Sequence, residues 1–543
     1  MSNILRSSIP YRGPISENLI EFIHKGLEKN SKETIIIDAL SGRSWKGKEI
    51  AASVRRVSRY LIDERGLKRG DTCAIYGRPD DQAVITILSV ICAGGASVFL
   101  SDAHRPRELL DTAKATNCKF LITTKSLLDQ GASTLSGLKD LIKVILYDFA
   151  SGGYEGIASL LDKNSSYQGY SVDELLEKTK INNESDFAVI QFSSGTTGKP
   201  KPIPRTHKNL CHLVASVDHE ELMDLKPGEV ITGSLAVTHR PGLWALLACI
   251  NGGSTFVLWS NLSDVEDALK TIEKYKVTIF SSSLPFLAML GNVGIKIKDN
   301  YDLSSLKHVI TSGAKIVHED LPKSVVRGFN LKSLRQCFGM TECGWVFLIE
   351  LSQAEDNYLS VGHVCPGMEA IIMDGENTTP LGAKVKKEIA LRGPQIFPGY
   401  LTSEPGVFNR NDFTHDGWFR TGDQGYYDEN RLVYIEGRYK ELLVLSNNYR
   451  YFPNDIESII SEHPAIEGVC VVKAGEYRKE IVYDIARAFV TLKHGYNITE
   501  KEIIDFISER SSKVLLDGGV RVLEKFPRLE NGKVNKSALK EMD

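Results

Sequence analysis

Hydrophobic and polar positions before about residue 360 alternate between two patterns. Between the turns lie segments with apolar residues at every third or fourth position, such as VEDALKTIEKY (265–275), which predict amphipathic helices. Short apolar and β-branched runs predict buried strands, and these are CAIYG (73–77), FLITT (120–124), VILYD (144–148), FAVIQF (187–192), STFVLW (254–259) and HVITSG (308–313). The alternation indicates α/β architecture with mainly parallel sheets.

The apolar stretch AVITILSVICAGGASVFL (83–100) is nearly as long as a membrane span. Gly94 and Gly95 interrupt it, a charged segment follows directly, and the sequence has no second candidate span. We therefore predict a buried helix, a glycine turn and a buried strand here, and no transmembrane segment.

The pattern changes beyond residue 360, where turns become denser. The runs EAIIMD (369–374), EIALRG (388–393) and RLVYIEG (431–437) predict a β-rich subdomain. From about residue 440 onward a small α/β module is expected. Its predicted helices are DIESIISEHP (455–464) and EKEIIDFISERSS (500–512), and its predicted strands are GVCVVKAG (468–475) and IARAFVTLKHG (485–495).

Composition narrows the functional classes. A chain of 543 residues exceeds one core and should divide into two or more domains. The net charge of -3 favours neither a nucleic-acid nor a membrane-surface partner. Nine cysteines without CxxC or zinc spacing, an N-terminus without a signal-peptide core and a C-terminus that is not Ser-Lys-Leu predict a cytoplasmic protein. The oligomeric state stays open.

Residues 193–204 read SSGTTGKPKPIP and are only superficially similar to a nucleotide-binding P-loop. A P-loop has four residues between its glycines, whereas two separate Gly195 from Gly198, and a proline follows Lys199 where Ser or Thr belongs. Two further prolines rule out a continuing helix, so the chain should leave this loop extended. Its hydroxyls, amides and ammonium groups suit a polyphosphate, although a flexible surface turn would have a similar composition.

Four more segments follow this loop in the sequence: RQCFGMTECG (335–344), DGWFRTGDQGYY (416–427), EGRYKELL (436–443) and PRLENGKVNKSALK (527–540). Each is weak alone. Together, in this order and over nearly the whole chain, they resemble the acyl-adenylate-forming superfamily, which includes acyl-CoA and aryl-CoA synthetases, nonribosomal adenylation domains and firefly luciferase.

The resemblance implies a fold and its division. The fold would be α/β, with a large N-terminal domain of two layered α/β sheet subdomains plus a β-barrel-like subdomain, and a small mobile C-terminal α/β domain. The N-terminal AMP-binding domain would span residues 1–436 and carry the ATP and acyl sites. A hinge at 437–441, with Lys440 as the pivot, would join it to the C-terminal domain at 442–543.

The resemblance also assigns roles to residues, and the chemistry explains them. Adenylation joins two anions, a carboxylate and the α-phosphate of ATP, so the site must neutralise charge. By resemblance, Glu342 holds Mg²⁺ through oxygen, and Asp423 accepts both ribose hydroxyls. Arg438 contacts ribose and phosphate, and Lys533 brings a mobile ammonium to the reacting carboxylate. Without the other motifs, a solvated lysine would be the simpler interpretation of Lys533.

The residues expected around ATP and AMP are Ser193, Ser194, Gly195, Thr196, Thr197, Gly198, Lys199, Gly313, Ala314, Gln336, Cys337, Phe338, Gly339, Met340, Thr341, Asp423, Arg438 and Lys533. Those expected to act in catalysis are Lys533, Thr196, Thr197 and His239. Those expected to line the acyl pocket are His239, Arg240, Ser312, Gly313, Phe338, Gly339 and Met340.

Departures from the family pattern bear on the substrate. Phe338 stands where relatives have a tyrosine that stacks on adenine, so stacking is kept and a hydroxyl is lost. Cys337 replaces a common glycine and would narrow the acyl pocket. His239 stands where amino-acid-activating domains carry an Asp, so a free amino acid would bury its ammonium unpaired. Arg240 could meet a second carboxylate or a phenolic oxygen, or face phosphate or the surface.

These features predict an AMP-forming acyl- or aryl-CoA synthetase that uses ATP, Mg²⁺ and CoA. The acid would be an aryl or medium-chain fatty acid, and 4-coumarate-CoA ligase-like and other aryl-acid-activating members are the most similar. Transfer to a carrier-protein phosphopantetheine, luciferase-like oxidation and a catalytically silent nucleotide-binding protein are the alternatives. Luciferases carry a lysine where this chain has Val444, which disfavours the second of these.

Overall fold

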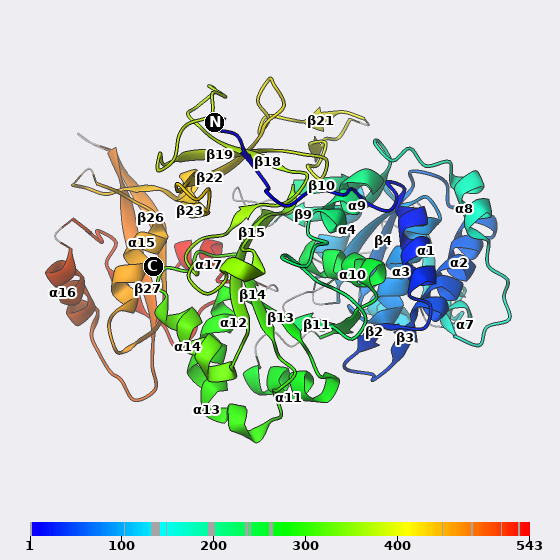
Figure 1. Cartoon of the computed structure of the whole chain (residues 1–543), viewed down its shortest axis with the longest axis horizontal. Helices are drawn as coiled ribbons and strands as arrows, with labels where there is room; N and C mark the ends of the chain where they lie inside the picture. Colours follow the sequence, from blue (N-terminus) through cyan, green and yellow to red (C-terminus); the bar gives the residue numbers. More distant parts are fainter. Residues whose placement is uncertain are drawn as a thin grey trace.

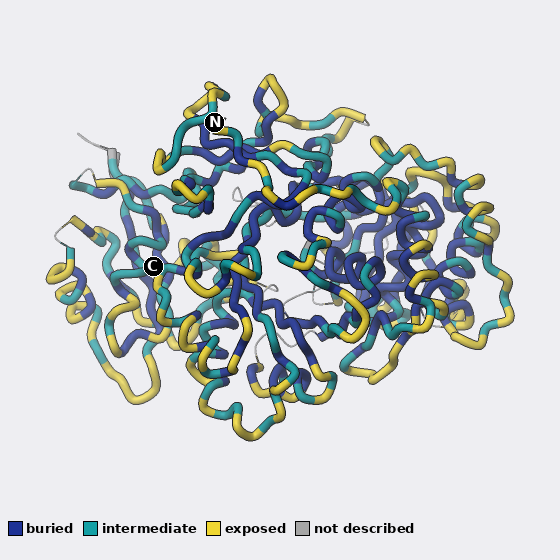
Figure 2. The backbone as a smooth tube through the Cα atoms, in the orientation of Figure 1, coloured by how far each residue is buried: buried dark blue, intermediate teal, exposed yellow. Residues whose placement is uncertain are grey.

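The computed structural model describes the 543-residue chain except residues 1–2, 103, 132–141, 148, 194–200, 234–236, 238–239, 260–263, 405, 448, 479–481, 512, 530–532 and 543. At residues 193, 240, 477–478 and 482 it describes the backbone alone. The central strands of its sheets are buried and most connections are exposed (Figure 2).

A seven-stranded sheet, in the order β10-β9-β5-β4-β6-β7-β8, forms one part of the described structure. It is parallel except for the edge strand β10, which pairs antiparallel with β9. An edge position suits β10, since its two prolines cannot donate to a ladder. The strands are β4 (Thr72–Gly77), β5 (Ala96–Ser101), β6 (Cys118–Thr123), β7 (Lys143–Leu146), β8 (Glu155–Gly156), β9 (Phe187–Ser193) and β10 (Lys201–Thr206).

A second sheet has nine strands in the order β17-β16-β15-β14-β13-β11-β12-β2-β3 among the described residues. Its middle is parallel, so the carboxyl ends of β13, β14 and β15 meet at one edge. The strands are β2 (Thr34–Asp38), β3 (Ser44–Lys46), β11 (Val230–Gly233), β12 (Thr255–Leu258), β13 (Ile279–Ser283), β14 (His308–Ser312), β15 (Ser333–Met340), β16 (Gly344–Leu348) and β17 (His363–Val364).

Helices cover these two sheets (Figure 1). Helix α11 (Val265–Tyr275) begins after Asp264, whose side chain accepts a hydrogen bond from the Asp267 amide and caps the helix. The other main helices are α1 (Leu19–Lys29), α2 (Gly47–Asp63), α3 (Asp81–Cys92), α4 (Pro106–Ala115), α8 (Val172–Thr179), α9 (His207–Ala215), α10 (Arg240–Gly252), α12 (Leu284–Met289) and α14 (Asp320–Phe329).

A third sheet is antiparallel, in the order β1-β18-β19-β22-β23. Burial alternates along β22 with the period of two expected of a strand, and Asp423 falls on the buried side. A carboxylate therefore stands at a position that the pattern reserves for apolar residues. The strands are β1 (Leu5–Arg6), β18 (Glu369–Met373), β19 (Lys387–Arg392), β22 (Phe419–Tyr427) and β23 (Val433–Arg438).

The C-terminal elements pack around a core of their own, which includes Ile456, Val471 and Ile503. In Figure 1 α15, α16, β26 and β27 lie together at one end of the long axis, and α17 lies nearer the middle. These elements are α15 (Pro453–Ser461), β26 (Ile466–Arg478), β27 (Val482–Leu492), α16 (Glu500–Arg510), β28 (Val520–Val522) and α17 (Lys536–Lys540). The short helix η5 (Tyr439–Glu441) leads into them from β23, through β24 (Leu443–Val444) and β25 (Arg450–Tyr451).

The sequence predictions of a mixed α/β fold with a large N-terminal and a small C-terminal domain are confirmed. The helix predicted at 265–275 is α11, and 83–100 divides into helix α3, a glycine turn and strand β5. In the part of the chain that is described, no helix is both long and apolar enough to cross a membrane.

Candidate active site

A large cavity, of about 3010 Å³, opens where the second sheet, the third sheet and the C-terminal elements meet. The carboxyl ends of β13, β14 and β15 border it, as is common for ligand sites in open α/β sheets. The cavity brings together these predicted site residues: Ser312, Gly313, Ala314, Gln336, Cys337, Phe338, Gly339, Met340, Thr341, Glu342, Asp423, Arg438, Lys440 and Lys533.

The end of β14 and the turn after it carry Ser312, Gly313 and Ala314 into this cavity. Gly313 has a φ of +91°, which a side chain would strain. Gln336 is buried in the neighbouring strand, and its Oε1 accepts a hydrogen bond from the Ile316 amide at 2.7 Å. The side chain predicted to lie near AMP thus also fixes the return of this turn.

Glu342 follows β15 and is 6% exposed. Its turn is held at the backbone: Arg205 donates to the Thr341 carbonyl at 2.8 Å, and the Phe397 amide donates to the Glu342 carbonyl at 2.9 Å. Gln395 adds hydrogen bonds to the carbonyls of Cys343 and Trp345. Residues from distant parts of the chain therefore fix the place of this carboxylate.

The side chain of Glu342 is also oriented. The hydroxyl of Tyr400 donates to its Oε1 at 3.0 Å, in a buried environment. Above the same tyrosine ring lies the ammonium of Lys201, 4.5 Å from the ring centroid. Since Lys201 begins β10, Tyr400 connects the predicted metal ligand to the strand that leaves the threonine-rich loop.

Asp423 is 4% exposed. Burial raises its pKa to about 6, and the nearby guanidinium of Arg438 opposes that shift. Arg438 Nε lies 3.2 Å from Asp423 Oδ1, whereas Oδ2 is buried and has no hydrogen-bond partner among the described residues. A buried acceptor without a donor fits a ligand hydroxyl, as the predicted contact with ribose requires.

Lys533 reaches the cavity from the C-terminal elements, just before α17. A Cβ built on Gly313 would lie 3.2 Å from its Cε and 3.4 Å from its Nζ. The lysine therefore crosses closely over the glycine turn of the second sheet. The ammonium and the two carboxylates, Glu342 and Asp423, border one cavity although up to 191 residues separate them in the sequence.

Part of the predicted site lies outside the described residues: Ser194 to Lys199, with Thr196 and Thr197, and His239. Only the backbone is described for Ser193, which ends β9, and for Arg240, which begins α10. The flanking residues Phe192, Lys201, Val237 and Pro241 all line the cavity.

Among the described residues no group of three or more His, Cys, Asp and Glu side chains could hold a metal ion. One buried carboxylate with a fixed oxygen is nevertheless compatible with Mg²⁺, which takes few protein ligands when phosphates and water complete its octahedron. Glu342 fits such a role.

Arg205 and Tyr400 support the site but were not predicted from the sequence. Arg205 lies in β10, after Pro202 and Pro204 of the same strand, and is 1% exposed. A cation within a run otherwise suited to burial was the available signal. Tyr400 lies in FPGYL, where nothing near it in sequence points to Glu342.

Comparison with known proteins agrees with this geometry. The family model for the AMP-binding enzymes matches residues 24–401, and the model for the AMP-binding enzyme C-terminal domain matches residues 455–533. A 4-coumarate–CoA ligase of Vanilla planifolia is 29% identical over 545 residues, which cover 99% of this chain and 96% of that protein. A luciferin 4-monooxygenase of Nipponoluciola cruciata is 26% identical, over 89% of this chain and 86% of its own.

The fold is also found among solved structures. The crystal structure of ATP-bound MatB from Rhodopseudomonas palustris superposes with a TM-score of 0.82, at 21% identity, over 97% of this chain and 99% of that one. At this identity the likeness concerns the fold.

Proposed function

The chain belongs to the AMP-binding enzyme family, and on this premise we propose that it is an AMP-forming acid–thiol ligase. It activates a carboxylic acid with ATP to an acyl-adenylate, releases pyrophosphate and transfers the acyl group to CoA as a thioester. The observation that carries the proposal is the convergence of Lys533, Glu342 and Asp423 on one cavity.

In the first half-reaction a carboxylate oxygen attacks the α-phosphorus, and pyrophosphate leaves with the bond electrons. Lys533 places positive charge between the two anions, and it approaches over Gly313, where no side chain intervenes. Asp423 Oδ2 and Arg438 hold the ribose, which fixes the α-phosphate relative to the acid. When bound at Glu342, Mg²⁺ supplies charge that stabilises the departing pyrophosphate.

The second half-reaction needs the lysine removed so that a thiol can reach the anhydride. We propose domains at residues 1–436 and 442–543, with a hinge at 437–441 pivoting on Lys440. In support, η5 (Tyr439–Glu441) directly follows β23 of the third sheet and leads into β24 among the C-terminal elements. Lys533 lies beyond this point and would leave with the C-terminal domain.

The choice of acyl acceptor and of acid rests first on a relative of the chain and then on the cavity. CoA as acceptor and an aromatic acid are both supported by the ligase of Vanilla planifolia, which matches over 99% of this chain. Cys337 and Phe338 both line the cavity, and Cys337 is buried. We propose that the Cys337 side chain, which is larger than the common glycine, narrows the acyl pocket and favours a flat ring or a medium chain over a bulky group. A carrier-protein phosphopantetheine is the alternative acceptor. We further propose a cytoplasmic location, which the nine buried free cysteines support.

A pyrophosphate-release screen over aromatic, medium-chain and long-chain acids tests the function, with CoA, with a phosphopantetheinylated carrier protein, or with neither. We expect release with an aromatic or medium-chain acid, and acyl-CoA only in the CoA arm. Acyl transfer only to the carrier would overturn the acceptor. Binding of ATP without release for any acid would instead support a catalytically silent nucleotide-binding protein.

A further inference from the structure

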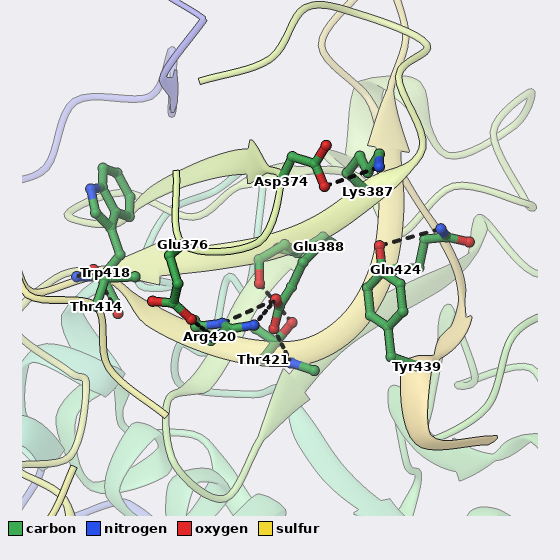
Figure 3. Close-up of polar contacts among 12 residues, drawn as sticks. Asp374, Glu376, Lys387, Glu388, Thr414, Trp418, Arg420, Thr421, Gln424 and Tyr439 are labelled. Atoms are coloured by element: carbon green, nitrogen blue, oxygen red, sulfur yellow. Dashed lines mark hydrogen bonds and ion pairs between the residues drawn. The ribbon is translucent and has the colours of Figure 1, made fainter. Parts of the chain in front are cut away.

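Glu388 is a buried acid that the proposed chemistry does not use. It lies in β19, its side chain is 9% exposed, and it borders the cavity. Both of its oxygens are engaged: Oε2 accepts from Arg420 Nε at 3.1 Å and Nη2 at 2.9 Å, and Oε1 accepts from the Gly422 amide at 3.1 Å (Figure 3). A buried charge is retained only when it is compensated in this way.

The backbone facing Glu388 is irregular. The ladder between β19 and β22 pairs Glu388 with Gln424 and Ala390 with Arg420, so residues 421–423 stand opposite Ile389 alone. This bulge leaves backbone groups without ladder partners. Side chains supply them: Thr421 Oγ1 donates to the Ile389 carbonyl at 2.8 Å and accepts from the Asp423 amide at 3.1 Å.

Glu388 therefore completes a set of contacts that fixes the backbone directly before Asp423. Gly422, with a φ of +70°, would otherwise be free to turn. Rotation there would swing the carboxylate of Asp423 away from Arg438 and misdirect Oδ2. An amide or a hydroxyl at position 388 could accept a hydrogen bond from the Gly422 amide but would not neutralise the charge of Arg420. A carboxylate does both, which explains why Glu388 stands here.

We propose that Glu388 is a positioning residue that orients Asp423 for the ribose hydroxyls. The inference rests on the proposed function, because it presupposes that Asp423 accepts those hydroxyls. Its consequence is specific: loss of Glu388 weakens the contribution of the hydroxyls to binding, and leaves adenine and phosphate recognition unchanged.

The test compares ATP with 2′,3′-dideoxy-ATP, which lacks both hydroxyls, as substrates of the wild-type enzyme and of Glu388→Gln. Gln keeps the size but presents a donor to Arg420. We expect KM for ATP to rise about tenfold, as for a lost bond to a charged group, and KM for the dideoxy analogue to stay unchanged. An equal rise for both nucleotides would mean a general structural role and would overturn the inference, as would no rise for either.

Glu376→Gln is the matched control. Glu376 also pairs with Arg420, at 2.5 Å, but its side chain is 80% exposed (Figure 3). This variant should discriminate between the two nucleotides as the wild type does. A tenfold rise in its KM for ATP alone would assign the effect to Arg420 and overturn the role of Glu388.

Two further arms keep the test decisive. If Glu388→Gln does not fold, Glu388→Asp retracts the carboxylate and retains its charge, and an unchanged preference for ATP in that variant overturns the inference. Calorimetric binding of AMP and 2′,3′-dideoxy-AMP gives the same comparison without turnover. If wild-type enzyme binds both nucleotides equally, the proposed ribose role of Asp423 fails, which is a different result from failure at Glu388 alone.

Discussion

The two sides of the cavity are built differently. On the nucleotide side, Asp423, Glu342 and Arg205 are all buried, and hydrogen bonds between side chains and the backbone hold the segments that carry the two carboxylates. On the other side Lys533 comes from the C-terminal elements, whose contacts with the rest include a hydrogen bond between the more exposed side chains of Ser458 and His318, at 2.7 Å. Rigid, desolvated contacts suit a part that stays in place, and solvated contacts suit one that must separate.

The segment that carries Lys533 is nevertheless held firmly within the C-terminal elements. Lys536, three residues after Lys533, forms an ion pair with Glu441 at 2.8 Å, directly beside Lys440. Both partners lie beyond the proposed pivot, so rotation would carry the pair as a unit. The comparison therefore predicts that changes on the nucleotide side affect nucleotide binding in both half-reactions, as ATP in the first and as acyl-adenylate in the second. Changes on the lysine side should affect adenylation alone.

The largest expected effect is that of Lys533→Ala. Removing the ammonium should lower acid-dependent pyrophosphate release about 10²- to 10³-fold, because a preorganised charge at the reacting centre is lost. Thiolysis of chemically supplied acyl-adenylate by CoA should stay within about twofold of wild type. Lys501→Ala, at an exposed position of α16 outside the cavity, is the control and should leave both steps unchanged. Equal loss of both steps in Lys533→Ala would contradict the separation of roles.

On the nucleotide side, Tyr400→Phe removes the hydroxyl that donates to Glu342 and keeps the ring beneath Lys201. We expect the Mg²⁺ concentration for half-maximal pyrophosphate release to rise about tenfold, since the carboxylate loses a buried hydrogen bond that orients it. The thermal shift produced by Mg²⁺–ATP should shrink in parallel. Tyr427→Phe, which removes a hydroxyl bonded to the Leu381 carbonyl outside the cavity, should change neither measurement.

A smaller effect concerns pH. Burial raises the pKa of Asp423 to about 6, with Arg438 opposing the shift and Glu441, Glu342 and Glu388 adding to it. Ionised Asp423 accepts better from ribose, so the preference for ATP over 2′,3′-dideoxy-ATP in kcat/KM should be retained above this pKa. It should fall about fourfold between pH 7 and 5.5, following the ionised fraction. The ratio cancels titration of the triphosphate, and Asp423→Asn should give a flat profile.

Ionisation of Asp423, which favours ribose recognition, has the opposite effect on the stability of the fold. The folded state binds the proton of Asp423 more tightly than the unfolded chain, so this group destabilises the fold as pH rises from about 4 through 6. Asp423→Asn should therefore raise the free energy of unfolding at pH 7 relative to wild type, measured by denaturant titration, while nucleotide binding weakens. A site that costs stability in this way is expected of a residue kept for function.

Motif residues were predictable from sequence because each lies in a short turn of recognisable composition: Glu342, Asp423 and Lys533 all reach the cavity. Their supports were not. Tyr400 is 58 residues from Glu342, and Arg205 is 136 from Thr341, so only the tertiary fold reveals these pairs. Likewise, the pairing of β1 with β18 places Leu5 opposite Ala370, 365 residues further along the chain, and no local pattern encodes it. The sequence therefore predicts which side chains carry the chemistry, but not the distant residues that orient them.

The smallest expected effect tests the domain contact. Ser458→Ala removes the hydrogen bond to His318 Nε2, which is partly solvated and therefore worth little, so adenylation should slow only about two- to threefold. Thiolysis of supplied acyl-adenylate should be unchanged or slightly faster, because the contact holds the lysine side in the position for adenylation. His318→Ala should have the same effect, and the double variant should be no worse than either, since one bond is lost in all three.

Ser508→Ala, which removes a hydroxyl that donates to the Ile504 carbonyl within α16, controls for serine loss elsewhere in these elements. Additive losses would mean that the two side chains act separately and that the contact does not hold the domains together.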